Sequence, residues 1–152
     1  MISLTLQQLI PVVQTAVGPV ILVSGVGLLL LSMTNRFGRV IDRSRLLARE
    51  LPAAAATERE HLSQQLAVLY RRAKIIRLAI ILATASVLLA GLLIISLFLA
   101  ALLHLEAALL VALCFILCMA SLVGSLIAFL FDLQVSLTAL RVELTQAGFG
   151  DA

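Results

Sequence analysis

The sequence of 152 residues is 62% hydrophobic and only 12% charged, with a mean hydropathy of +1.18. A soluble domain of this length cannot bury so much apolar surface, because small domains have a high ratio of surface to volume. The composition therefore excludes an ordinary soluble protein and predicts a single integral membrane domain, residues 1–152, with an all-α fold of three transmembrane helices. The formal net charge is +3. All eleven arginines and lysines lie close to apolar segments, which argues against binding to nucleic acid.

The first predicted span covers residues 12–34 and follows Pro11, whose missing N–H costs nothing at the start of a helix. Gly18-Pro19 predicts a bend within it, because proline removes a backbone hydrogen bond. Small and polar residues recur on one side of this helix, at Gln14, Gly18, Gly25, Ser32, Asn35 and Arg39. Such a stripe prefers protein or water to lipid. It predicts either a pore lining, if several copies assemble, or the face on which the three spans of one chain pack.

Residues 36–77 are predicted to form an antiparallel helical hairpin that continues both neighbouring spans beyond the membrane. Pro52 ends the first helix, and Thr57 to Glu60 form a capping-box pattern that begins the second. Each helix carries an apolar stripe with heptad-like steps. The stripe residues are Phe37, Val40, Leu47 and Leu51 before the turn and Leu62, Leu66, Leu69, Ala73 and Ile76 after it. We expect the two stripes to face each other.

The second and third spans are predicted at residues 78–103 and 107–131, joined by a very short turn at His104–Glu106. In the third span Ala120, Gly124 and Ala128 recur every four residues, a pattern of small side chains that lets another helix approach closely. Residues 132–146 are predicted to continue it as an amphipathic, cytoplasmic C-terminal helix, since leucines recur there at steps of three and four.

The distribution of charge predicts how the chain crosses the membrane. Ten of the arginines and lysines lie between Arg36 and Arg77, together with four acidic residues. The loop on the other side of the membrane contains no arginine or lysine. Basic loops stay in the cytoplasm. We therefore expect residues 36–77 and the C-terminus inside the cell and the N-terminus outside.

Several charged residues lie at the inner ends of the first and third spans, namely Arg36, Asp42, Arg43, Arg45 and Asp132. Arginines at this depth orient a membrane protein and contact anionic lipid head groups. In an oligomer they could instead surround the inner mouth of a pathway and favour anions. Asp132 is expected at the same depth as Arg77 and Arg36, which predicts an ion pair with one of them.

No pattern of residues predicts catalysis. His61 and His104 fall on opposite sides of the predicted bilayer, and the sequence has no glycine-rich phosphate loop and no Ser–His–Asp set. Cys114 and Cys118 are interpreted as small apolar residues of a membrane helix rather than as a disulfide or a metal pair. The sequence therefore predicts a protein that is not an enzyme and has no catalytic, cofactor or metal site.

The block from Asn35 to Arg45 reads N-R-x-x-R-x-x-D-R-x-R and follows a span that contains proline. In this block the chain resembles a family of small, uncharacterised bacterial membrane proteins. The rest of the similarity, Tyr70-Arg71-Arg72 and a C-terminal half with two spans, is one of layout. The resemblance implies three spans, a cytoplasmic helical hairpin and a place in the bacterial inner membrane, and it implies no established activity.

Three hypotheses of function are open. The leading one is a homo-oligomeric, channel-like membrane protein whose first span lines an ion pathway that favours anions. The second is a scaffold or accessory subunit that docks a partner protein through its cytoplasmic hairpin. The third is a membrane protein that binds anionic lipid head groups through its basic residues. The faces of small residues on the first and third spans favour a homo-oligomer.

Overall fold

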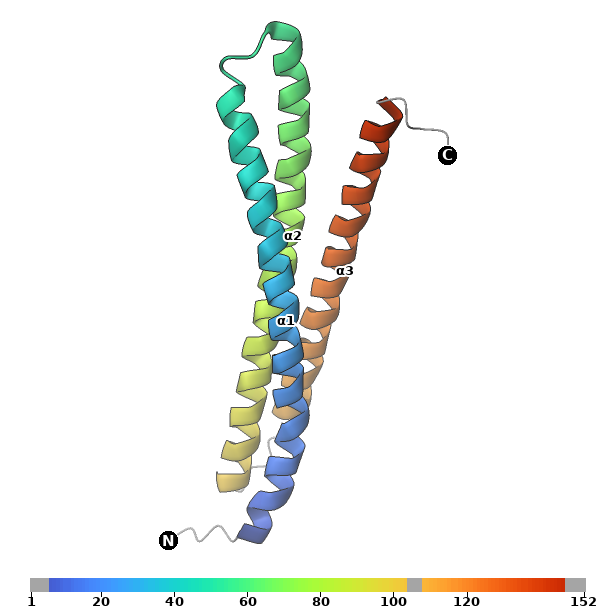
Figure 1. Ribbon diagram of the computed structural model, residues 1–152. Coiled ribbons are helices and arrows are strands. Elements are labelled where there is room, and N and C mark those ends of the chain that lie inside the picture. Colours follow the sequence, from blue (N-terminus) through green and yellow to red (C-terminus); the bar gives the residue numbers. More distant parts are fainter. Residues whose placement is uncertain (1–5, 104–107, 147–152) are drawn as a thin grey trace. The chain divides into compact units, whose positions relative to one another are not determined.

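The computed structural model describes residues 6–103 and 108–146, with side chains at 10–11, 13–56, 58–103 and 108–136. Within these residues the chain is all-α, with helices α1 (Leu6–Glu50), α2 (Ala56–Leu103) and α3 (Ala108–Gln146) (Figure 1). The turn predicted at His104–Glu106 lies outside the described residues.

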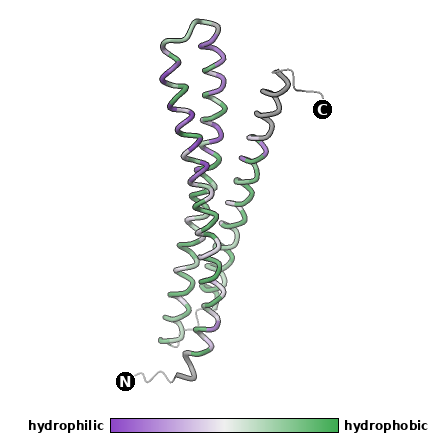
Figure 2. Tube along the Cα trace, in the orientation of Figure 1, coloured by the Kyte–Doolittle hydropathy of each residue, from purple (hydrophilic) through white to green (hydrophobic). Residues whose placement is uncertain are grey.

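Each helix contains a segment long and apolar enough to cross a membrane, namely Val13–Glu50, Glu58–Leu103 and Ala108–Ser136. Figure 2 shows apolar residues along most of every helix, and hydrophilic residues gathered toward the end of α1 and the beginning of α2. A helix satisfies its own backbone hydrogen bonds, as the hydrocarbon core of a bilayer requires. The prediction of an all-α integral membrane protein with three helices able to span the membrane is confirmed.

The first helix is longer than the span predicted from sequence. It begins at Leu6, so Pro11 does not open it, and both Pro11 and Pro19 lie inside it. Thr15 Oγ1 donates a hydrogen bond to the carbonyl oxygen of Pro11 at 2.8 Å. Proline has a φ that fits a helix and removes one backbone hydrogen bond, which membrane helices tolerate, so the apolar run continues through both prolines.

The start of α2 also differs from the prediction. The helix begins at Ala56, and the N–H of Arg59 donates to the carbonyl oxygen of Ala55 at 2.8 Å. Ala55 therefore occupies the N-cap position that the capping-box pattern assigned to Thr57. The Arg59 guanidinium donates to the carbonyl oxygen of Pro52 at 3.3 Å, so this side chain bridges the turn between α1 and α2.

The described helices pack in two compact units. Among the described residues, the first unit combines residues 6–31, 81–103 and 108–124, and the second unit combines residues 32–80 and 125–146. Every helix contributes a segment to both units. The side chains of each unit are positioned by the packing within that unit.

In the second unit the apolar stripes of α1 and α2 pack on each other. Val40, Ala73 and Ile76 form its buried core, and Phe37 and Leu69 pack against them. These residues belong to the two stripes predicted on either side of the turn, so the expectation that the stripes face each other is confirmed for them. The two stripes pack on each other because heptad-like spacing keeps one side of each helix apolar over several turns.

Helix α3 packs on α2 through small polar side chains. In the first unit, Cys118 Sγ donates to the carbonyl oxygen of Ser86 at 3.2 Å, and Ser121 Oγ donates to that of Leu82 at 2.8 Å. In the second unit, Ser125 Oγ donates to the carbonyl oxygen of Ala79 at 2.7 Å. Residue numbers rise along α3 as they fall along α2, so the two helices are antiparallel. Small side chains at these positions allow the backbones to come within hydrogen-bonding reach.

Two of the three small residues expected on the packing face of α3 lie on it. Ala128 is buried and Gly124 is half-buried, but Ala120 is exposed. A Cβ atom on Gly124 would lie 3.4 Å from Leu82 Cδ1, an ordinary van der Waals contact. The face centres instead on Cys118 and Ser125, because hydroxyl and thiol groups need backbone acceptors in an apolar medium and α2 supplies them.

Candidate functional site: an ionic cluster of three helices

A buried carboxylate of α3 meets one arginine from each of the other two helices. Asp132 is 0% exposed. Its Oδ1 accepts a hydrogen bond from Arg72 Nε on α2 at 3.2 Å, and its Oδ2 lies 3.3 Å from Arg36 Nη2 on α1. The side chains of Arg36 and Arg72 are 23% and 16% exposed. All three residues belong to the second unit, so this unit contains a complete ionic cluster.

The packing pattern of each helix accounts for these positions. Asp132 follows Cys118 and Ser125 at steps of seven, so it continues the face with which α3 packs. Arg72 lies one turn before Ile76, at the edge of the apolar stripe of α2. Arg36 lies next to Phe37, which packs against the same core. Each helix thus turns its charged residue toward the side on which it packs.

The carboxylate of Asp132 is shielded from solvent, so its negative charge has lost its hydration. A buried carboxylate without a partner would be strongly destabilising, and two guanidinium groups compensate it here. Asp132 Oδ2 has no hydrogen-bond donor of suitable geometry among the described residues, so its attraction to Arg36 is one of charge. The Phe129 ring lies 5.4 Å from Arg36 Cζ and contributes a cation–π interaction on one side of the guanidinium.

The ion pair expected between Asp132 and either Arg36 or Arg77 is confirmed for Arg36. Asp132 pairs with Arg36 as predicted, whereas Arg77 is exposed and Arg72 is the second partner. The sequence does not distinguish the two arginines, because Arg72 lies beside Ala73 and Arg77 lies beside Ile76 on the same apolar stripe. Whichever arginine packs inward requires a buried anion on a neighbouring helix.

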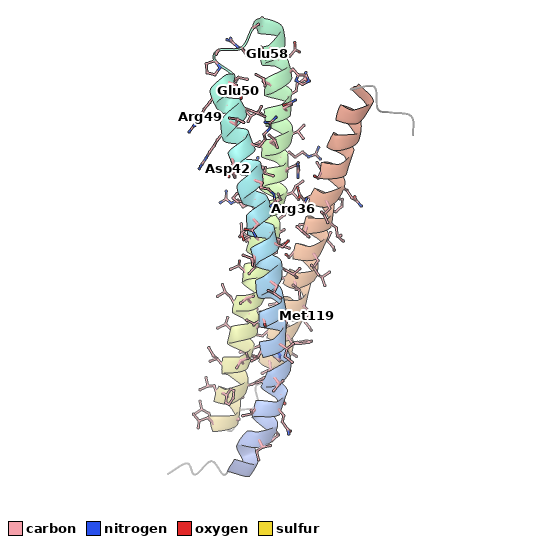
Figure 3. The ribbon with its side chains drawn as sticks, viewed as in Figure 1. Arg36, Asp42, Arg49, Glu50, Glu58 and Met119 are labelled. Atoms are coloured by element: carbon pink, nitrogen blue, oxygen red, sulfur yellow. The ribbon has the colours of Figure 1, made fainter. Side chains whose placement is uncertain are left out.

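The remaining charges of the first helix lie on its surface. Asp42, Arg43 and Arg45 are exposed, as is Arg39. Figure 3 shows Arg36, Asp42 and Arg49 following one another along α1. Both ion pairs within the described part of the chain are made by Asp132, so Asp42 takes part in neither.

The polar stripe of α1 is exposed along its whole length. This holds for Gln14, Gly18, Gly25, Ser32, Asn35 and Arg39. The residues that α1 buries within the chain are others, and Val26, Met33, Val40 and Leu47 among them follow at steps of seven. The stripe residues therefore share one side of α1, and no other part of the described chain packs over them.

Among the described residues, no group of three or more histidine, cysteine or acidic side chains lies close enough to hold a metal ion. His104 and Glu106 lie outside the described residues. The chemistry that the cluster offers is therefore recognition by charge and hydrogen bonds, supplied by two guanidinium groups and one carboxylate.

Comparison with protein families gives a match over residues 16–142 to a family described as "Protein of unknown function (DUF2721)". The chain belongs to the DUF2721 family. Comparison with curated proteins found no match, and comparison with solved structures found none.

The part of the chain that DUF2721 covers includes the whole ionic cluster. Arg36, Arg72 and Asp132 lie inside residues 16–142, as do the stripe residues from Gly18 to Arg39, whereas Gln14 lies outside. This DUF2721 protein is therefore an integral membrane protein of unknown function whose three apolar helices carry a buried ionic cluster.

Proposed function

We propose that this membrane protein acts by assembly and conduction rather than by catalysis, with several copies associating through α1 around an ion pathway. The observation that carries the proposal is the exposure of all six stripe residues in the single chain, while α1 turns other residues toward its own core. Polar side chains such as Gln14 and Asn35 are costly against lipid tails. Contact with other copies, or with water enclosed by them, removes that cost.

The length of the stripe supports a pathway through the whole membrane. From Gln14 to Arg39 an α-helix rises about 38 Å, at about 1.5 Å per residue. The hydrocarbon core of a bilayer is about 30 Å thick. A stripe of this length reaches from one membrane interface to the other. A local packing contact between two helices would need only a shorter stripe.

The charge at one end of the stripe supports a preference for anions. Arg39 ends the stripe, and Arg43 follows one turn later on the same side of α1; both are exposed. In a ring of several copies these arginines repeat around the axis and raise the local concentration of anions. Gln14, Ser32 and Asn35 then supply uncharged hydrogen-bonding groups along the pathway.

The proposed location is the inner membrane of a bacterium, with the N-terminus outside and the arginine-rich segment and the C-terminus in the cytoplasm. The resemblance of the block from Asn35 to Arg45 supports the bacterial setting. The concentration of basic residues between Arg36 and Arg77 supports the orientation. In the same setting the end of α1 and the beginning of α2 form a cytoplasmic helical hairpin.

The test measures ion current in planar bilayers containing the purified protein, under a gradient of potassium chloride. We expect a current whose reversal potential lies toward that of chloride. Arg39→Glu should move the reversal potential toward that of potassium, and Arg45→Glu, which changes an exposed arginine off the stripe, should move it less. Absence of current from a preparation whose particle mass is that of one chain would refute the proposal.

A second candidate function is binding to anionic lipid through a basic collar, defined here as Arg39, Arg43, Arg45, Arg49, Arg71, Lys74 and Arg77. All seven residues are exposed, and they follow the first uncharged run of the sequence or precede the second. Each contributes about 1 kcal/mol near an anionic surface, and salt screens this attraction. Retention of phosphatidylglycerol by the purified protein should therefore fall as sodium chloride is raised. Retention that does not change with salt would exclude the collar as its cause.

A further inference from the structure

The ionic cluster has more positive than negative charge. Arg36 and Arg72 carry two positive charges against the single negative charge of Asp132. Each guanidinium has five N–H donors, and one nitrogen of each lies within 3.3 Å of a carboxylate oxygen of Asp132. Two largely buried guanidinium groups with one net positive charge are costly in a medium of low dielectric constant. A further anion beside them would lower that cost.

The order of charged residues along the sequence predicts that the cluster lies at the depth where phosphate groups are concentrated in a membrane. Arg36 is the first charged residue of the sequence, at the end of a long uncharged run. Asp132 is likewise the first charged residue after the uncharged run that follows Glu106. Helices leave the hydrocarbon core and enter the head-group region at such positions. Both arginine side chains keep some exposed surface.

We propose that Arg36 and Arg72 bind one phosphate group, while the buried carboxylate of Asp132 offsets only part of their positive charge. Planar guanidinium groups donate paired hydrogen bonds to phosphate oxygens, which makes phosphate a better match than a halide ion. The phosphate belongs either to a lipid head group or to a free phosphate ion, and both present the same oxygens.

This site rests on the second candidate function, lipid binding by the basic collar, and deepens it. The collar is a set of exposed residues that attracts any anionic surface, whereas Arg36 and Arg72 form a defined pair. The Phe129 ring beside Arg36 limits the orientations of that guanidinium. Asp132 has a second effect, since its negative charge opposes the negative charge of the ligand.

The experiment measures phosphatidylglycerol bound to the detergent-solubilised, full-length protein by native mass spectrometry, with diacylglycerol as the lipid without phosphate. Arg72→Gln should weaken binding more than about tenfold, because it removes charge-assisted hydrogen bonds. Arg71→Gln is the matched control, since Arg71 is exposed and adjacent in sequence, and should weaken binding less than about fivefold. Asp132→Asn keeps both arginines and should strengthen binding, a change that misfolding cannot produce.

Equal losses in Arg71→Gln and Arg72→Gln would overturn the site and leave the collar. A failure of Asp132→Asn to strengthen binding would overturn it as well. If the unchanged protein binds no phosphatidylglycerol, the collar and the site fail together. An excess of inorganic phosphate distinguishes the two sources of ligand: displacement of the lipid indicates that free phosphate occupies the site, and retention of the lipid indicates a head-group site.

Discussion

Replacing Asp132 with asparagine tests the ionic cluster most directly. The amide keeps the shape of the carboxylate but not its charge, so the guanidinium groups of Arg36 and Arg72 face each other without compensation. Breaking a buried ion pair costs about 3–5 kcal/mol. The arginines here keep 23% and 16% of their side-chain surface exposed, which relieves part of that cost. We therefore expect the free energy of unfolding to fall by about 3 kcal/mol.

The assay is equilibrium unfolding in mixed micelles, followed by loss of helical signal as the fraction of denaturing detergent rises. Asp42→Asn is the control, because Asp42 is an exposed carboxylate of α1 outside both ion pairs, and we expect a change within about 0.5 kcal/mol. Combining Asp132→Asn with Arg36→Gln should cost at least about 1 kcal/mol less than the sum of the single changes. If Asp132→Asn is no more destabilising than Asp42→Asn, the carboxylate is not held as described.

Three further predictions concern packing and orientation. Gly124→Leu should lower the free energy of unfolding by about 1–3 kcal/mol, because its side chain would enter the space of Leu82. At Gly25 an added Cβ atom would meet nothing within 4 Å in the chain, so Gly25→Leu should act mainly on association between copies, measured by particle mass. Ser125→Ala should cost about 0.6 kcal/mol in the same unfolding assay, the loss of one interhelical hydrogen bond in a membrane. Arg49→Cys should react with a membrane-impermeant thiol reagent only after the cells are opened, and labelling of intact cells would reverse the proposed orientation.

Periodicity predicted contacts well where one apolar stripe met another. Val40 on α1 and Ile76 on α2 were expected on facing stripes, and both lie in the buried core of the second unit. This worked because a step of seven residues keeps a side chain on nearly the same side of a helix over many turns. Helix ends were predicted less well: Pro11 lies inside α1, because the loss of one backbone hydrogen bond is small beside the burial of a long apolar helix in lipid.

The face of α3 could not be chosen from its own sequence. Ala120, Ser121 and Ser125 all belong to a region of small residues, and a pattern of small side chains fits several rotations of one helix. The acceptors decide between them, since the carbonyl oxygens of Leu82 and Ala79 lie on α2 and bind Ser121 and Ser125. Because the medium is apolar, the hydroxyl groups need hydrogen-bond acceptors, and the neighbouring helix determines where those acceptors lie.

The amino-acid sequence alone determined the medium and the elements: its hydrophobic content is too high for water, and its uncharged runs are long enough for helices that cross a bilayer. The tertiary structure decided which charges meet. Arg36, Arg72 and Arg77 all lie near the uncharged runs of their helices, so any of them could neutralise Asp132. The rotation of α2 turned Arg72 toward Asp132 and left Arg77 exposed. Spacing along a helix fixes which residues share a face, but the orientation of that face toward a partner follows from how the side chains of both helices pack.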